Sequence, residues 1–135
     1  MDRKQTAKDL FLQGYNCAQA VCAAFSDVAG LSAEQMLKIS VAFGGGFLHG
    51  NSLCGALAGV GIVLGCIFGE TDADGKKRFL ERFQGVVARF ERDFGGLNCR
   101  ELKPAAVLKG ECEPKPCMIY VLWCVDVIEE MLCKD

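Results

Sequence analysis

The chain has 135 residues, of which 51% are hydrophobic, and its 15 basic and 17 acidic residues leave a formal net charge of −2. This length corresponds to about one domain, and a domain of this size can bury a core without disulfide cross-links. The charge balance lacks the basic excess that nucleic acid or an anionic membrane surface attracts, so we expect neither as a partner. We treat residues 1–135 as a single domain.

Nine of the residues are cysteines, which is a high density and an odd number. The N-terminal residues are charged and no apolar run follows them, so we expect no signal peptide and a cytoplasmic protein. In a reducing cytosol, cysteines tend to be catalytic, redox-sensing or metal-binding rather than structural cross-links. The cysteines are therefore the first candidates for function.

Three helices are predicted before the first glycine cluster. A short amphipathic helix is expected over residues 2–13, and one apolar stripe at helical spacing predicts a second helix over 17–28. Ser32 and Gln35 form a capping-box pattern, which predicts the start of a third helix. The three glycines at 44–46 end that helix.

Residues 39–69 contain no charged side chain. The most apolar part of this stretch, residues 53–68, is shorter than the roughly 20 residues that a membrane-spanning helix needs. We therefore expect no stable membrane insertion, and predict a glycine-rich helix buried on all sides in a helical bundle. The glycines allow neighbouring helices to approach closely.

The second half of the chain continues the helical pattern. Apolar residues from Phe79 to Phe94 keep a period of 3.6 residues, which predicts a long amphipathic helix. A short helical piece is expected from Asn98, and residues 104–116 are expected to be mostly loop. A last helix follows, with Cys117 at the head of its apolar stripe. The predicted fold is all-α, a single compact bundle of five to six helices around the glycine-rich helix.

Four cysteines stand at predicted helix starts, where Asn, Ser or Pro supplies the starting signal. The backbone N–H groups of a helix start are unpaired and the helix dipole is positive there, so a thiolate is stabilised and the cysteine pKa falls. We therefore predict one thiol site assembled from several helix starts. Its cysteines are Cys17, Cys54, Cys99 and Cys117.

The other five cysteines divide into two groups. Four lie inside helices or at a chain end, where a free cysteine behaves as a small buried hydrophobe, and these are Cys22, Cys66, Cys124 and Cys133. Cys112 lies between two glutamates, which disfavour a thiolate. It remains a candidate to resolve an oxidised Cys117.

The chain contains no CxxC pair, so any disulfide or metal site must be assembled by tertiary folding. His49 is the only histidine and precedes Cys54 by five residues, which makes it a candidate base or ligand for that thiol. Gly55 and Gly59 are expected to allow close helix packing, with Cys54 at the head of their helix.

The order of the four cysteines, together with a short glycine motif, resembles the C-GCAxxG-C-C family, whose members are inferred to be redox-active. The resemblance covers nearly the whole chain and implies redox activity without an assigned reaction or substrate. The family label spells Gly-Cys-Ala where this chain has Cys-Gly-Ala. The matching positions are Cys17, then Cys54, Gly55, Ala56 and Gly59, then Cys99, and finally Cys117.

Three functions remain open from the sequence. In the leading one, Cys54 is the attacking thiol, one of the other three cysteines resolves it, and no cofactor is required. Its partner would be a redox protein or a small-molecule thiol. In the second, Cys17, Cys54, Cys99 and Cys117 bind zinc or an iron–sulfur cluster. In the third, the thiols are packed in a structural or interaction module, and a homodimer is compatible with the apolar composition.

Overall fold

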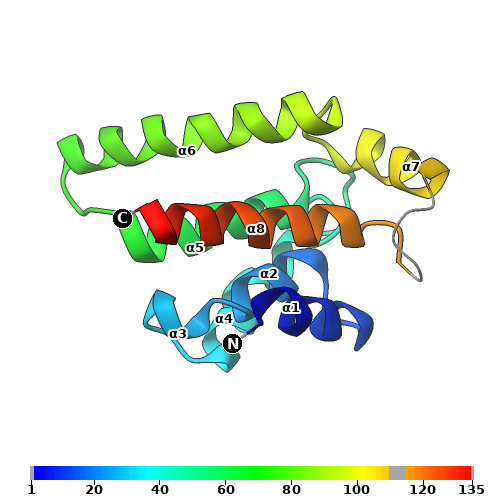
Figure 1. The fold of residues 1–135 in the computed structure, drawn as a ribbon, viewed down its shortest axis with the longest axis horizontal. Coiled ribbons are helices and arrows are strands. Elements are labelled where there is room, and N and C mark those ends of the chain that lie inside the picture. Colours follow the sequence, from blue (N-terminus) through cyan, green and yellow to red (C-terminus); the bar gives the residue numbers. More distant parts are fainter. Residues whose placement is uncertain (1, 110–114, 135) are drawn as a thin grey trace.

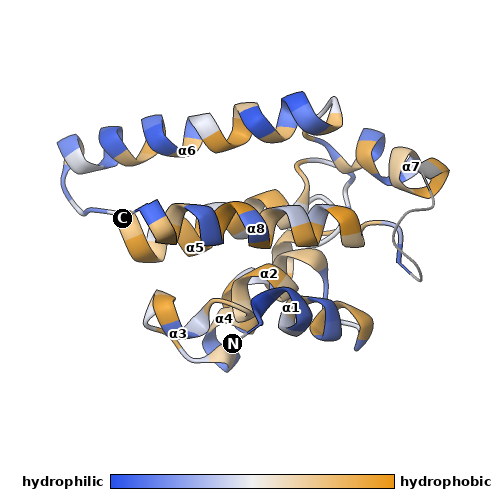
Figure 2. Ribbon diagram, in the orientation of Figure 1, coloured by the Kyte–Doolittle hydropathy of each residue, from blue (hydrophilic) through white to orange (hydrophobic). Residues whose placement is uncertain are grey.

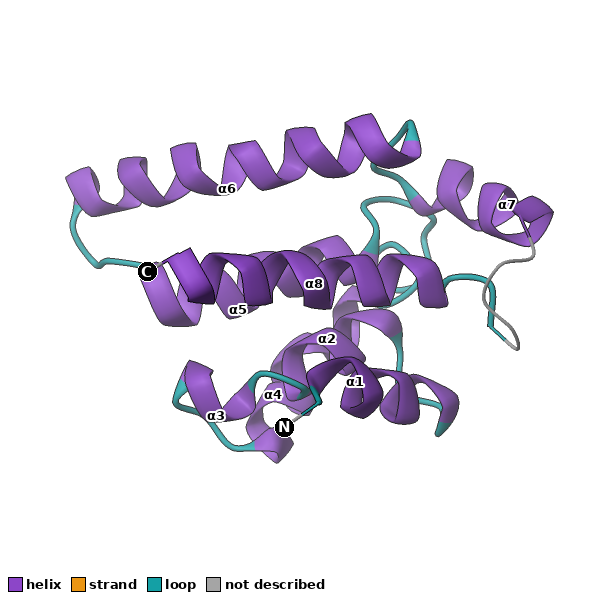
Figure 3. Ribbon diagram, in the orientation of Figure 1, coloured by secondary structure: helices purple, strands orange, loops and turns teal. Residues whose placement is uncertain are grey.

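The computed structural model describes residues 2–109 and 115–134. Within these residues it contains no strand, and one isolated bridge joins Leu53 and Asn98 (Figure 3). The all-α prediction is confirmed, with more helices than the five to six expected. The elements are α1 (Arg3–Leu12), α2 (Cys17–Ala23), α3 (Ser26–Ala29), α4 (Ala33–Ser40), the 3₁₀-helix η1 (Val41–Phe43), α5 (Gly55–Phe68), α6 (Ala73–Phe94), α7 (Cys99–Lys109) and α8 (Met118–Lys134).

The helices lie in three rough layers (Figure 1). Helices α5 and α8 lie side by side in the middle, with α6 on one side and α1 to α4 on the other. Helix α5 packs against α2, α3, α6 and α8, which confirms its predicted central place. Within the described ranges, no helix is long and apolar enough to cross a membrane.

The predicted second helix is divided in two, so that prediction is wrong in its length. Helix α2 ends at Ala23, and a turn at Ala24 and Phe25 precedes the short helix α3. The turn places the Phe25 side chain in the core, where it is fully buried. Val28, expected on the buried stripe, is instead 37% exposed.

The predicted loop over residues 104–116 is wrong in its first part. Helix α7 continues through Pro104 to Lys109, although proline removes one helical hydrogen bond. Burial of Leu102 and Ala106 on the inner face of α7 favours the longer helix. The Tyr120 hydroxyl also donates a hydrogen bond to the Leu102 carbonyl, which fastens α7 to α8. Residues 110–114 lie outside the described part.

The cysteines predicted to be packed differ in their surroundings. Cys22 and Cys124 are fully buried, as expected. Cys66 and Cys133 are exposed, so the prediction is wrong for these two. They lie in or near the last turns of α5 and α8, where the neighbouring helices no longer cover them.

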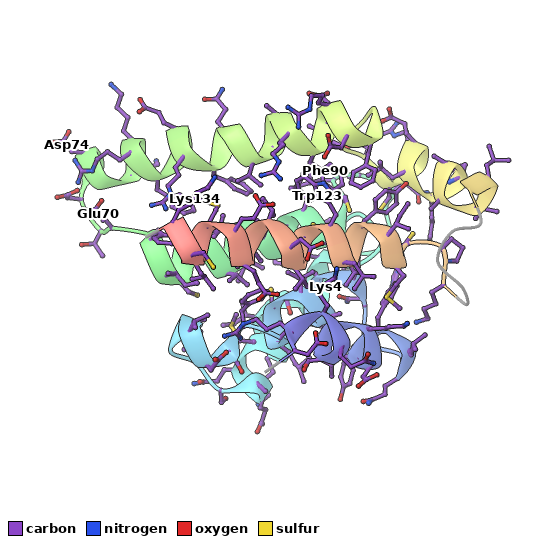
Figure 4. All side chains as sticks on the ribbon, viewed as in Figure 1. Lys4, Glu70, Asp74, Phe90, Trp123 and Lys134 are labelled. Atoms are coloured by element: carbon purple, nitrogen blue, oxygen red, sulfur yellow. The ribbon has the colours of Figure 1, made fainter. Side chains whose placement is uncertain are left out.

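An aromatic cluster joins the long helix α6 to α8. The Phe90 ring is fully buried and meets the Trp123 ring edge to face, with ring centroids 5.1 Å apart (Figure 4). Phe94 meets Tyr120 in the same manner at 4.8 Å. The Trp123 indole N–H donates to the Asp93 carboxylate at 2.9 Å. The opposite face of α6 is largely hydrophilic (Figure 2).

We expect the buried Phe90 ring to stabilise the packing of α6 against α8. We expect Phe90→Ala to lower the free energy of unfolding by about 3–5 kcal/mol, because it removes a buried ring and leaves a cavity. Leu80→Ala on the same helix is the control, since Leu80 is 50% exposed and the change should stay within about 0.5 kcal/mol. Urea unfolding followed by circular dichroism measures both. Equal losses of unfolding free energy in the two variants would contradict the proposed role of Phe90 in holding α6.

Candidate functional site

The four predicted site cysteines all stand at helix starts, as expected. Cys17 and Cys99 are the first residues of α2 and α7. Cys54 caps the start of α5, and Cys117 immediately precedes α8, where its carbonyl accepts the N–H of Tyr120 at 3.1 Å. Three of these starts, those of α5, α7 and α8, gather at one end of the bundle (Figure 1).

Backbone pairing between two distant segments brings Cys54 and Cys99 together. The Cys54 N–H donates to the Leu97 carbonyl at 2.8 Å, and the Cys99 N–H donates to the Ser52 carbonyl at 2.7 Å. The Arg100 N–H donates to a third carbonyl, that of Asn51, at 3.1 Å. These bonds flank the Leu53–Asn98 bridge and satisfy N–H groups at the starts of both helices. The starts of α5 and α7 are therefore fixed beside each other.

Gly55 lets the start of α2 approach the start of α5. A Cβ atom at Gly55 would lie 2.6 Å from the Cys17 sulfur and 2.6 Å from the Phe43 carbonyl oxygen, which is too close for a real contact. A Cβ atom at Gly59 would lie 3.1 Å from the Val21 Cβ atom. Absent side chains at Gly55 and Gly59 thus allow the predicted close helix packing.

The sulfur of Cys17 lies within electrostatic range of the other three. Burial is the largest cause of a raised pKa at Cys54, Cys99 and Cys117, and a charge on Cys17 is the next cause at each. A charge on Cys99 also acts on Cys54 and Cys117, so the four cysteines named from the sequence lie in one region of the fold.

The predicted lowering of the Cys54 pKa is wrong. Its thiol is only 3% exposed, and burial raises its pKa to about 12. The backbone N–H groups of Leu57 and Ala56 oppose this rise, as expected at a helix start, but their effect is smaller. Burial also raises the pKa of Cys117 to about 11. The N–H groups of the helix start lower the pKa of Cys54, as predicted, but removal of the thiol from water raises it by more.

A cavity of about 230 Å³ opens at the cysteine cluster. Cys17, Cys99 and Cys117 line it, whereas Cys54 does not. Cys17 and Cys117 are half-buried and Cys99 is buried, so the cluster has an accessible side and a covered side. The polar side chains around these thiols are Tyr15, Asn16, His49, Lys103 and Lys115.

His49 lies on a left-handed loop at the cavity. Phe47, Leu48 and His49 all have positive φ, with values of 66°, 52° and 55°, a conformation that non-glycine residues rarely adopt. Such strained backbone is often found at functional sites. The His49 imidazole covers Gly45, where a Cβ atom would meet its Nδ1 atom. His49 thus lines the same cavity as Cys17, a cavity that Cys54 does not line.

The metal alternative has no ready-made geometry in this structure. Within residues 2–109 and 115–134, no three His, Cys, Asp or Glu side chains are arranged to hold a metal ion. The resolving role considered for Cys112 concerns a residue outside the described part.

The sequence reasoning missed the two lysines of the cavity. Lys103 follows Cys99 by four residues on α7, a spacing that places both on one helix face. Both residues fall in the short helical piece predicted from Asn98, so this spacing was a signal in the sequence. Lys115 lies next to a proline in the segment predicted as loop and carried no comparable signal. Its ammonium donates to the Phe11 carbonyl at 2.6 Å, which holds it beside the cavity.

Fold and site define an all-α protein whose four cysteines converge from four helix starts. The chain belongs to the family described as "Putative redox-active protein (C_GCAxxG_C_C)", whose model matches residues 15–131. The resemblance seen in the sequence is thereby confirmed. No curated protein and no solved structure matches the chain.

The close approach at Gly55 predicts a clear effect of one added methyl group. We expect Gly55→Ala to lower the free energy of unfolding by about 1–3 kcal/mol, because the Cβ atom overlaps the Cys17 sulfur and a backbone oxygen. Gly85→Ala on α6 is the matched control. No atom lies within 4 Å of its added Cβ, so we expect a gain of about 0.5–1 kcal/mol. Equal changes in thermal unfolding would contradict the packing argument.

Burial of the cluster predicts slow alkylation of Cys54. At pH 8 we expect iodoacetamide to modify the exposed Cys66 and Cys133 first, and Cys54 at least ~100-fold more slowly, because little of it is thiolate. Mass spectrometry of timed samples measures each site, with urea-unfolded protein as the control. Alkylation of Cys54 as fast as Cys66 would contradict this account.

The raised pKa of Cys54 also predicts how stability depends on pH. In the unfolded chain the Cys54 thiol ionises at a lower pH, so the free energy of unfolding should fall as pH rises from about 9 to 12.

Proposed function

We propose that this protein carries out thiol–disulfide exchange in a reducing cytosol, with Cys17 as the attacking thiol and Cys99 as the resolving thiol. The observation that carries the proposal is the cavity lined by Cys17, Cys99 and Cys117 at the meeting point of the helix starts. The membership in a family described as redox-active supports the same chemistry. No metal or organic cofactor takes part.

Cys17 fits the attacking role because attack needs both access and a nearby second thiol. Its side chain is half-buried and lines the cavity. Cys99 and Cys117 line the same cavity, so a second thiol is at hand. Cys54, the attacking thiol expected from the sequence, does not fit this role, since it is 3% exposed and does not line the cavity.

Cys99 fits the resolving role because it lines the same cavity as Cys17, and both side chains have Gly55 as a neighbour. The Cys17 sulfur packs against Gly55, whose backbone N–H favours the thiolate of Cys99. Lys103, one turn further along α7, also favours that thiolate. Burial and the charge on Cys17 outweigh these effects and keep the Cys99 pKa raised, so Cys99 rests as a thiol. It loses its proton when the Cys17 sulfur has entered a mixed disulfide.

The reaction consumes one external disulfide and two protein thiols. The Cys17 thiolate attacks one sulfur of the external disulfide, whose S–S bond breaks and whose leaving thiolate takes up a proton. The Cys99 thiolate then attacks the Cys17 sulfur, forms the protein disulfide, and releases the second external thiol. Two electrons pass from the protein to the substrate, and the two protons come from Cys17 and Cys99.

Single-turnover reduction of 2-hydroxyethyl disulfide by pre-reduced protein tests this assignment. Cys17→Ser should abolish rapid release of thiol. Cys99→Ser should release one thiol and keep the other half of the substrate bound to Cys17, which adds its mass to the peptide of that cysteine. Cys66→Ser and Cys133→Ser are the controls, because they remove exposed thiols outside the cavity and should leave the rate unchanged.

Three results would overturn the assignment. These are full activity in Cys17→Ser, a protein disulfide that joins two cysteines other than Cys17 and Cys99, and stoichiometric zinc or iron in anaerobically purified protein that is lost with any of the four cysteines. The last result would favour the metal alternative. Loss of stability alone in Cys17→Ser, without any reversible oxidation of the wild type, would favour a structural role for the thiols.

A further inference from the structure

The cavity of the cysteine cluster has cationic walls. A second hollow of about 410 Å³ adjoins it, since Cys99 and Lys103 line both. Arg100 lines the second hollow, and Lys115 lines the first. Within the described residues, no carboxylate lines either hollow, although the chain as a whole carries a formal net charge of −2. Three cationic side chains, Lys103, Lys115 and Arg100, thus line the two hollows that contain the thiols.

Two of these cations are held in place beside the thiols. Lys103 lies one helical turn after Cys99, so the α7 backbone fixes its position relative to that sulfur. The Lys115 ammonium donates to the Phe11 carbonyl at 2.6 Å and lies 4.4 Å from the centroid of the Phe11 ring. These contacts hold the Lys115 charge at the wall of the cavity that contains Cys17 and Cys117.

We propose that the substrate of this site is a small disulfide that carries carboxylate groups. The inference rests on the thiol–disulfide function proposed above and names the substrate class of that same site. A carboxylate bound at Lys103 or Lys115 would place an attached disulfide among the thiols that line the same cavity. Arg100 lies in the adjoining hollow and attracts the same anion on its approach.

The charge arrangement also suits the exchange steps. Attack by the Cys17 thiolate transfers negative charge to the leaving sulfur of the substrate, and a nearby ammonium stabilises that charge. The leaving thiolate takes up the proton released by Cys17, and the second thiolate takes up the proton released by Cys99. An anionic substrate gains from the lysines in both steps, whereas a cationic one is repelled.

Three disulfides of similar size and different charge test the proposal. They are 3,3′-dithiodipropionate, which is anionic, 2-hydroxyethyl disulfide, which is neutral, and cystamine, which is cationic. Each single-turnover rate constant with pre-reduced protein is divided by the rate constant for the same disulfide with dithiothreitol, which corrects for intrinsic reactivity. We expect the corrected rate constant to be at least ~10-fold higher for the anionic than for the cationic compound, and the difference to shrink at high salt.

Charge reversal at one lysine provides the matched comparison. Lys103→Glu should remove or invert the preference for the anionic disulfide, while the neutral disulfide reports whether the variant still folds and reacts. Lys77→Glu makes the same change on exposed α6, outside both hollows, and should preserve the preference. Lys103→Gln distinguishes loss of positive charge from gain of negative charge.

The outcomes separate this inference from the function on which it rests. Equal corrected rates for the three disulfides, or an unchanged preference in Lys103→Glu, would overturn the anionic substrate and leave thiol–disulfide exchange standing. Failure of the wild type to reduce any of the three would overturn both. A preference that persists in Cys17→Ser would assign the reaction to another thiol and overturn the site.

Discussion

The short backbone pairing between residues 51–54 and 97–100 is the constraint on which the site depends. Its hydrogen bonds join the loop before α5 to the turn before α7, two segments distant in sequence. They supply partners for N–H groups that a helix start leaves open, so they stabilise both helices while fixing their relative position. The pairing places the start of α5, which Cys54 caps, beside the start of α7, where Cys99 is the first residue.

Burial and helix-start electrostatics act in opposite directions on the thiols of this cluster. Unpaired N–H groups favour a thiolate at Cys54, whereas removal from water disfavours it, and removal from water is stronger. Burial therefore favours the protonated thiol at Cys54, Cys99 and Cys117. The exchange proposed for this site therefore relies on its half-buried thiols and on charges such as Lys103 that lie beside them.

Local sequence signals predicted the parts of the site, and tertiary contacts decided their relations. Capping residues such as Asn16 identify a helix start from a few neighbouring residues, which is why the placement of Cys17 was predictable. The loop predicted from Pro104 was wrong because burial of Leu102 and Ala106 and the hydrogen bond from Tyr120 are tertiary contacts that the local sequence does not reveal. The position of His49 depends on a left-handed loop, which its glycines and Asn51 tolerate but which Phe47 and Leu48 give no reason to expect.

The four cysteines lie far apart in sequence and meet only through the folded helices. A disulfide between any two of them would close a long loop. By lowering the entropy of the unfolded chain, such a link raises the free energy of that chain by about 3–5 kcal/mol at room temperature. Oxidation would then make the fold harder to unfold, and by linkage the fold would make the disulfide harder to reduce. The geometry of the helix bundle would thus help to set the reduction potential of its own thiols.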